Sequence, residues 1–168
     1  QNPNPVANNY FGHGVSIEGD TIAIGANGDD QKGSNAGVVQ IFKNSLIDES
    51  WIFHQQLLPN DLVAGDQFGR SMSLQDPFLL IGADQYTFGP GKVYLYEKES
   101  QSTSSNWTLI SIITSSDPPT SRSLFRYSLS QFNGNAIIGA HYSTTNGLSN
   151  AGSAYLLNGF DSDKDLIP

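Results

Sequence analysis

Two short motifs recur three times along the chain with the same spacing. A phenylalanine stands at Phe11, Phe68 and Phe125, at steps of 57 residues (68 − 11 and 125 − 68). The tripeptide Ile-Gly-Ala begins at Ile24, Ile81 and Ile138, again at steps of 57. Since a fixed period of this length is the mark of repeated supersecondary units, the chain should fold as three copies of one unit.

Each copy reads as a series of short strands. The stretch from Phe11 to Ile17 alternates apolar with small or polar residues, as a half-buried strand does. A tight turn should follow, and the Asn133-Gly134 pair of the third copy suits a hairpin. The next strand is almost wholly apolar in every copy, which predicts a strand buried on both faces. These second strands are expected at 21–26, 78–83 and 136–140.

Two further strands complete the unit in the first two copies. The third strand is expected at 37–42, 91–96 and 152–157, and the fourth begins at Trp51 and Trp107. Four antiparallel strands with periodic glycine and aromatic positions are typical of a β-propeller blade. A sandwich would also contain short strands, but it gives no reason for the 57-residue period. We therefore expect an all-β chain of three four-stranded blades, at residues 1–60, 61–114 and 115–168.

The motifs together resemble a known family. Tyr10-Phe11-Gly12, Ile24-Gly25-Ala26 and the segment Gly37 to Phe42 are similar to the FG-GAP repeat of integrin α-subunit propellers. The resemblance is closer to the variant found in secreted microbial proteins. The third copy departs from it, because Arg126 replaces the glycine after Phe125 and no tryptophan marks a fourth strand. The outer strand of that blade is therefore expected to be weak or missing.

Three blades are too few to form a closed propeller ring, which typically has four to eight. The unit's apolar flanks and strand edges would be left uncovered, so another polypeptide should cover them. Val6-Ala7 aligns with Val63-Ala64, and Leu166-Ile167-Pro168 is similar to Leu57-Leu58-Pro59. The chain thus begins and ends at nearly one phase of the repeat, which favours a head-to-tail homo-oligomer, as a ring or a filament. The alternative is that these residues are part of a longer propeller.

Composition narrows the function and the location. The net charge is −8 with only 8 Lys and Arg residues, which disfavours nucleic-acid binding. No apolar run is long enough to span a membrane. Cysteine is absent, so thiol chemistry and disulfides are excluded. We expect an extracellular or secreted protein, with Gln1 suiting a processed terminus and Asn106-Trp107-Thr108 as an N-glycosylation sequon.

Calcium is the candidate cofactor. The resemblance implies Asp-rich calcium loops in the hairpin before the second strand, but Glu18-Gly19-Asp20 is too short for such a loop. Two other clusters offer oxygen ligands. They are Asn27, Asp29 and Asp30 after the first Ile-Gly-Ala, and Asp161, Asp163 and Asp165 near the end of the chain. The second cluster resembles the start of a thrombospondin type 3 calcium repeat. The alternative for the first cluster is a solvated acidic loop, and the alternatives for the second are a disordered acidic tail or a weak fourth strand.

Catalysis has little support in the sequence. His13, His54 and His141 are the only histidines, and no nucleophile elbow or zinc-binding helix motif is present. We therefore expect a non-enzymatic structural protein that self-assembles through blade faces and head-to-tail strand complementation. The alternative is an adhesin-like or lectin-like module that binds a protein or glycan, with Tyr86 and Tyr142 in variable loops as candidate contacts.

Overall fold

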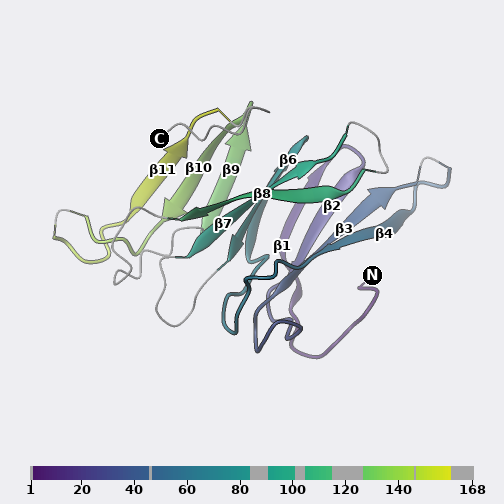
Figure 1. Ribbon diagram of the computed structural model, residues 1–168, viewed down its shortest axis with the longest axis horizontal. Helices are drawn as coiled ribbons and strands as arrows, with labels where there is room; N and C mark the ends of the chain where they lie inside the picture. Colours follow the sequence, from purple (N-terminus) through teal and green to yellow (C-terminus); the bar gives the residue numbers. More distant parts are fainter. Residues whose placement is uncertain are drawn as a thin grey trace.

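The computed structural model describes residues 2–45, 47–83, 91–100, 105–114, 127–145 and 147–159. All regular elements in these ranges are β-strands, which form three separate antiparallel sheets (Figure 1). The all-β prediction is therefore confirmed. Within these ranges there is also no helix with the length and apolar character that a membrane crossing needs.

Each sheet is a simple meander, in which every strand pairs with the strand before it. Blade 1 contains β1 (Phe11–Glu18), β2 (Thr21–Ala26), β3 (Val38–Asn44) and β4 (Trp51–Leu57). Blade 2 contains β5 (Ser71–Gln75), β6 (Phe78–Ala83), β7 (Lys92–Lys98) and β8 (Trp107–Thr114). Blade 3 contains β9 (Ser128–Phe132), β10 (Asn135–Ala140) and β11 (Ser153–Leu157). Among the described residues blade 3 thus has three strands rather than four.

The hairpin turns follow from the local sequence. Asn133 and Gly134 both have positive φ angles, 48° and 70°, as a two-residue hairpin between right-twisted strands requires. Gly19 has a φ of 54° in the corresponding turn of blade 1. Blades 1 and 2 also share a finer detail, because the pairing of the third and fourth strands shifts register between Ile41 and Phe42 and between Leu95 and Tyr96.

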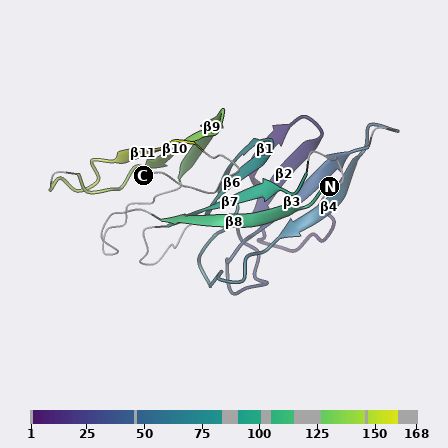
Figure 2. The ribbon, with the colours of Figure 1, turned by 45° about the horizontal axis from the view of Figure 1, so that its top comes forward.

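The blades stand side by side in chain order. Their first strands are neighbours, since β1 packs against β5 and β5 packs against β9 (Figures 1 and 2). The same hydrogen bond links both pairs. The Leu74 N–H donates to the Ser16 hydroxyl over 3.0 Å, and the Gln131 N–H donates to the Ser73 hydroxyl over 3.2 Å. Each blade is therefore placed against the next by a contact that repeats with the sequence.

The hydrophobic core lies between the blades and not within any one of them. One cluster joins Ala23, Val39, Ile41 and Leu57 of blade 1 to Met72, Leu74, Leu79, Ile81, Tyr94, Tyr96 and Trp107 of blade 2. A second cluster joins Phe78, Leu80, Val93, Leu95 and Ile113 of blade 2 to Ala136, Ile138 and Ala140 of blade 3. Among the described residues only blade 2 is therefore covered on both faces, and the row of blades they form does not close into a ring.

The burial of the second strands shows this directly. Every residue of β6 is buried, as its continuous apolar sequence predicts. In β10, however, Ile137 is exposed whereas Ala136 and Ile138 are buried. The prediction that this strand is buried on both faces is wrong for blade 3. The reason is that no blade in the described residues covers the face of β10 that points away from blade 2.

Candidate functional site

The outer face of blade 1 exposes apolar residues whose equivalents in blade 2 are buried. Met72 and Leu74 of β5 point toward blade 1 and are each 9% exposed. Their equivalents one repeat earlier, Val15 and Ile17 of β1, are each 64% exposed. The residues of both pairs lie two apart on a strand, so each pair shares one face of its sheet. The difference in burial therefore comes from the neighbouring blade and not from the strand itself.

The fourth strand extends this exposed surface across the sheet. Trp107 opens β8 and is buried against blade 1, and Leu109 packs beside it. Trp51 and Phe53 hold the same places in β4, and both are exposed. We call Val15, Ile17, Trp51 and Phe53 the open face of blade 1.

Blade 3 has a complementary exposed surface on the opposite side of the row. Leu95 pairs with Leu80, and both are buried against blade 3, with Leu95 only 2% exposed. The equivalent pair in blade 3 is Leu156 and Ile137, and Leu156 is 65% exposed. Phe132 at the end of β9 is also exposed. We call Phe132, Ile137 and Leu156 the open face of blade 3.

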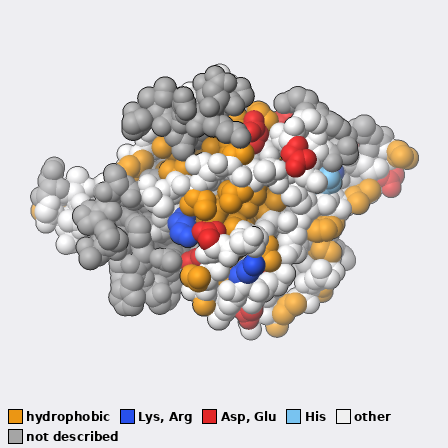
Figure 3. All heavy atoms as spheres, in the orientation of Figure 1, with side chains coloured by type: hydrophobic (Ala, Val, Ile, Leu, Met, Phe, Trp, Pro, Cys, Tyr) orange, Lys and Arg blue, Asp and Glu red, His pale blue; other side chains and the backbone are white. Residues whose placement is uncertain are grey.

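These two surfaces have the chemistry of an interface. Contiguous exposed apolar residues on a soluble protein commonly mark a contact with another molecule. Figure 3 shows apolar side chains gathered over the middle of one face and along the part of the molecule that holds blade 1. Fully burying a side chain such as Leu or Ile contributes about 1.5–3 kcal/mol, so covering either open face would be strongly favourable.

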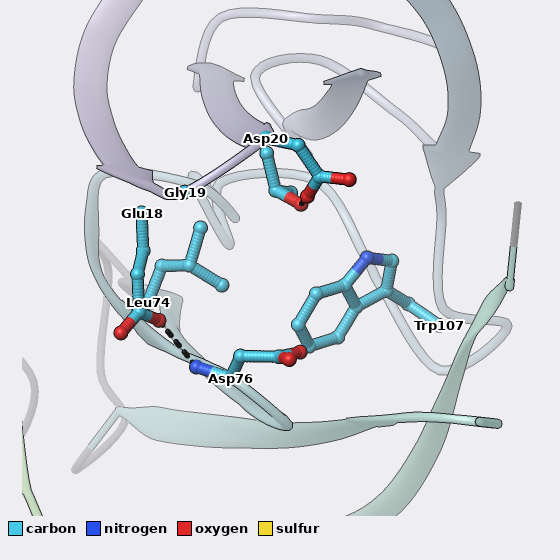
Figure 4. A pocket seen from close by; sticks show the side chains of 7 residues that line it. Glu18, Gly19, Asp20, Leu74, Asp76 and Trp107 are labelled. Atoms are coloured by element: carbon cyan, nitrogen blue, oxygen red, sulfur yellow. Dashed lines mark hydrogen bonds between the residues drawn. The ribbon is translucent and has the colours of Figure 1, made fainter. Parts of the chain in front are cut away.

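A pocket of about 160 Å³ lies where the hairpins of blades 1 and 2 meet. Figure 4 shows Asp20 and Asp76 on opposite sides of it, Leu74 facing Trp107 across it, and the six-membered ring of Trp107 directed toward the middle. The Asp76 N–H donates to the Glu18 carboxylate across the blade junction (Figure 4). The indole N–H of Trp107 has no hydrogen-bond acceptor in the part of the chain that the structure describes.

Two of the three carboxylates that line this pocket lie beside lysines. Lys43 Nζ lies 3.5 Å from Asp20, and Lys98 Nζ lies 3.3 Å from Asp76. Burial alone would raise the pKa of Asp20, but the hydrogen bond from Thr21 and the charge of Lys43 hold it below its ordinary value. Burial lowers the pKa of Lys43, which the charge of Asp20 only partly offsets. Each of the two ion pairs lies within one blade, and the hydrogen bond from Asp76 to Glu18 crosses the junction between the blades.

The family is shown by comparison with known proteins. The family model described as the FG-GAP repeat matches residues 3–42, 51–96 and 107–157. The chain belongs to the FG-GAP repeat family. A search of curated proteins finds no match to the chain. FG-GAP repeats are typical of extracellular recognition and adhesion modules built as propellers, and the family is typically non-enzymatic.

The first candidate calcium cluster of this FG-GAP chain lies in the loop between β2 and β3. Asp29 is buried, and its two carboxylate oxygens accept hydrogen bonds from the Asn9 side chain at 2.8 Å and the Gln31 N–H at 3.0 Å. Asp30 accepts from the Asn35 N–H at 2.8 Å. The described residues contain no group of three His, Cys, Asp or Glu side chains placed to hold a metal ion. These carboxylates therefore organise the loop, and calcium binding there stays a prediction.

Several predicted residues lie outside the described ranges. They are Tyr86 and the second calcium cluster, Asp161, Asp163 and Asp165. Asn106, the predicted glycosylation site, is described and exposed immediately before β8. Its side chain is therefore accessible to a modifying enzyme.

Tyr142 is exposed and belongs to a row of aromatic rings. Its ring centroid lies 4.3 Å from that of His141, which lies 4.2 Å from that of Tyr127. The guanidinium carbon of Arg70 stands 5.5 Å from the centre of the Tyr127 ring. This aromatic row offers flat, partly polar surfaces of the kind that stack on ligands. The loop position indicated Tyr142 but not Tyr127, whose ring lies against His141 because the chain entering β9 pairs with β10.

The other histidines are used in contacts between blades. His13 lies 3.3 Å from the Arg70 carbonyl oxygen, and His54 lies 3.1 Å from the Ser105 carbonyl oxygen. Neither contact pairs a histidine with a nucleophile.

The residues of the open faces were not predicted individually. The sequence shows that Val15 and Ile17 are apolar at the positions that Met72 and Leu74 hold one repeat later, but their exposure is visible only in the structure.

Proposed function

We propose that this FG-GAP chain is a non-enzymatic, extracellular structural protein that self-assembles through its blade faces. The open face of blade 3 would pack on the open face of blade 1 of a second copy, and edge strands would complement one another head to tail. Repetition of that contact gives a ring where the rotation closes and a filament where it does not.

The carrying observation is the contrast in burial at equivalent positions. Met72 and Leu74 are buried because blade 1 covers them, whereas Val15 and Ile17 meet no blade in the described residues. The two open faces are also different surfaces, since the open face of blade 1 and the open face of blade 3 lie at opposite ends of the row of blades. A contact between unlike faces of identical chains is heterologous, which is what repeated assembly requires.

The oligomeric state of the purified chain tests the proposal. Light scattering after gel filtration and negative-stain imaging should show rings or filaments at micromolar concentration. The Val15→Glu, Ile17→Glu double variant places carboxylates on the open face of blade 1 and should remain monomeric. Ile47→Glu is the matched control, because Ile47 is almost fully exposed on the hairpin between β3 and β4. A folded chain that stays monomeric at high concentration would contradict self-assembly and favour a piece of a longer propeller.

The aromatic row supports a second candidate, an adhesin-like or lectin-like module. Tyr127 and Tyr142 are both exposed, and aromatic rings are common contacts for sugars and peptides. A glycan array with the native chain would show binding, and Tyr142→Ala should abolish it. Tyr155→Ala serves as the comparison, since Tyr155 packs in the core between blades 2 and 3. An array without signal, together with assembly in solution, would leave the structural role alone.

A further inference from the structure

The junction of blades 1 and 2 contains a second contact, separate from the stacked sheet faces. The segment before β5 lies along the loop that connects β2 and β3. Three of its N–H groups donate to consecutive carbonyl oxygens of that loop: Gly65 to Ser34 at 2.8 Å, Gln67 to Asn35 at 3.0 Å, and Phe68 to Ala36 at 2.9 Å. Gly37 and Phe68 form a parallel bridge at the end of this run. We call residues 34–37 the receiving loop of this contact and residues 63–69 its donating segment.

The receiving loop occurs again in blade 3. Ser34-Asn35-Ala36-Gly37 is repeated without change as Ser149-Asn150-Ala151-Gly152. The backbone is repeated as well, because Asn35 and Asn150 have φ angles of 52° and 59°, and Gly37 and Gly152 have φ angles of 87° and 81°. The loop of blade 3 therefore holds the receiving conformation.

This second receiving loop has no occupant in the described residues. Ala36 is completely buried under the donating segment, whereas Ala151 is exposed. A methyl group added to Gly37 would overlap the backbone of Phe68. A methyl group added to Gly152 would meet nothing closer than the His141 carbonyl oxygen of its own blade, at 3.4 Å.

The donating segment also occurs twice. Val63-Ala64 and Phe68-Gly69 have their equivalents in Val6-Ala7 and Phe11-Gly12. Three positive φ angles recur at the same places. They are 87°, 47° and 88° at Gly65, Gln67 and Gly69, and 65°, 51° and 96° at Asn8, Tyr10 and Gly12. Such angles are uncommon for residues other than glycine, so their recurrence at Asn8 and Tyr10 shows that the same conformation is kept.

Blade 1 itself holds this first segment in place. The Asn9 N–H donates to the Val6 carbonyl oxygen, and the Asn9 carbonyl oxygen accepts from the Gly28 N–H at 3.2 Å. The Asn9 side chain is buried and donates to Asp29. The N–H groups of Asn8 and Tyr10 have no acceptor among the residues that the structure describes. The segment is thus preorganised for a partner, which lowers the entropic cost of binding.

We infer that the segment Val6–Gly12 of one copy docks on the loop Ser149–Gly152 of a second copy. The N–H groups of Asn8, Tyr10 and Phe11 would donate to the carbonyl oxygens of Ser149, Asn150 and Ala151. This inference rests on the proposed self-assembly, and it adds the loop contact that fixes the register between copies.

A second copy is the occupant for two reasons. Blade stacking within the chain already brings the segment before β5 to the loop of blade 1, and the same stacking between copies would bring the segment before β1 to the loop of blade 3. The sequence also distinguishes the two junctions within the chain. At the junction of blades 2 and 3 the loop ends in Phe88-Gly89-Pro90-Gly91 and the following segment ends in Phe125-Arg126. The loop of blade 3 and the segment before β1 instead match the sequences at the junction of blades 1 and 2.

The two loops are anchored alike, which allows individual residues to be paired. The Gly37 N–H donates to the Asp29 carbonyl oxygen, and the Gly152 N–H donates to the Ser143 carbonyl oxygen. Likewise Gly33 donates to Asp30, and Leu148 donates to Thr145. A Cβ atom placed on Gly33 would lie 3.2 Å from the Cβ of Ala64. The residues at the corresponding sequence positions across the copies are Leu148 and Ala7, although Leu148 does not share the positive φ of 125° at Gly33.

Disulfide trapping tests this pairing, because the chain has no cysteine of its own. Cβ atoms at such a separation are close to disulfide range. Ala7→Cys and Leu148→Cys chains, one of them with a size tag, are mixed and oxidised. The mixed covalent dimer should form at least tenfold faster than in a mixture of Ala7→Cys with Ile47→Cys. Ile47 is a suitable control because it is almost fully exposed on the hairpin between β3 and β4.

A blocking substitution provides the second arm. Ala151→Arg should weaken association at least tenfold without changing the melting temperature of the single copy, since Ala151 is exposed. Ile47→Arg should leave both unchanged. Native chains that assemble, with no preferential cross-link and with unimpaired Ala151→Arg assembly, would overturn the inference and leave blade-face assembly standing. Native chains that never associate would overturn both.

Discussion

Gly25 and Gly139 occupy the same place in the Ile-Gly-Ala motif, but they meet different neighbours. A methyl group at Gly25 would overlap the Gly69 carbonyl group of blade 2, which is backbone and cannot move aside. At Gly139 the methyl group would meet the hydroxyl of Ser128, which can rotate. Gly25→Ala should therefore lower the free energy of unfolding by about 3 kcal/mol, and Gly139→Ala by less than about 1 kcal/mol. Urea unfolding of both variants measures this, and equal losses would contradict close packing at Gly25.

Asp61 gives a prediction for the effect of pH. Its carboxylate accepts from Lys92 Nζ at 2.6 Å and from the Tyr94 hydroxyl at 3.0 Å. Burial would raise the pKa of Asp61, but these two donors bring it below the ordinary value of 3.8. A carboxyl group with a lowered folded-state pKa stabilises the fold above its unfolded pKa, and this contribution is lost as the pH falls through the folded-state pKa.

Asp61→Asn should therefore lower the free energy of unfolding at pH 7, by less than about 1 kcal/mol because the carboxylate is partly exposed. The difference from the native chain should shrink steadily below about pH 4. Urea unfolding at pH 7, 5 and 3 measures it. Tyr94→Phe removes one donor but keeps the ring, which packs on Phe68 at 5.1 Å, and should cause a smaller loss. A loss for Asp61→Asn that is independent of pH would contradict the assignment.

At the scale of the elements, a serine hydroxyl in each first strand is placed to accept from the next blade. Ser73 accepts from the Gln131 N–H, whereas Ser130 is exposed at the same position of blade 3. Ser73→Ala should cost about 1 kcal/mol in unfolding free energy, because the Gln131 N–H loses its acceptor. Ser130→Ala should leave the stability of a single copy unchanged. Equal losses in chemical denaturation would show that this hydrogen bond does not hold the blades together.

The sequence predicted strands better than it predicted burial. The strand Thr21–Ala26 and the strand Phe78–Ala83 have the expected bounds, because apolar runs and turn residues are local signals. Burial of β10 was mispredicted because it depends on a neighbouring blade, which the local pattern does not contain. The hydrogen bond that Asp29 accepts from Asn9 is likewise absent from any local pattern, because it links residues 20 positions apart.

At the scale of the whole molecule, the exposed ends of the row decide what the chain can become. Ile41 and Leu156 are equivalent, since each stands opposite the middle of its blade's second strand, at Ala23 and Ile137. Ile41 is completely buried by blade 2, whereas Leu156 faces solvent. A carboxylate in place of Ile41 must disrupt the fold, because an unpaired carboxylate cannot be buried between blades without a large cost in free energy. A carboxylate in place of Leu156 tests assembly alone.

Leu156→Glu should change the unfolding free energy of a single copy by less than about 0.5 kcal/mol, since its side chain is exposed. It should nevertheless weaken association by at least tenfold, because docking would take the new carboxylate out of water. Sedimentation velocity over a range of concentrations measures the second effect, and urea unfolding measures the first. Leu156→Met keeps the apolar surface and should assemble like the native chain. If folded Leu156→Glu assembles as well as Leu156→Met, the open face of blade 3 is not an interface, and the exposed residues of blade 1 must find a different partner.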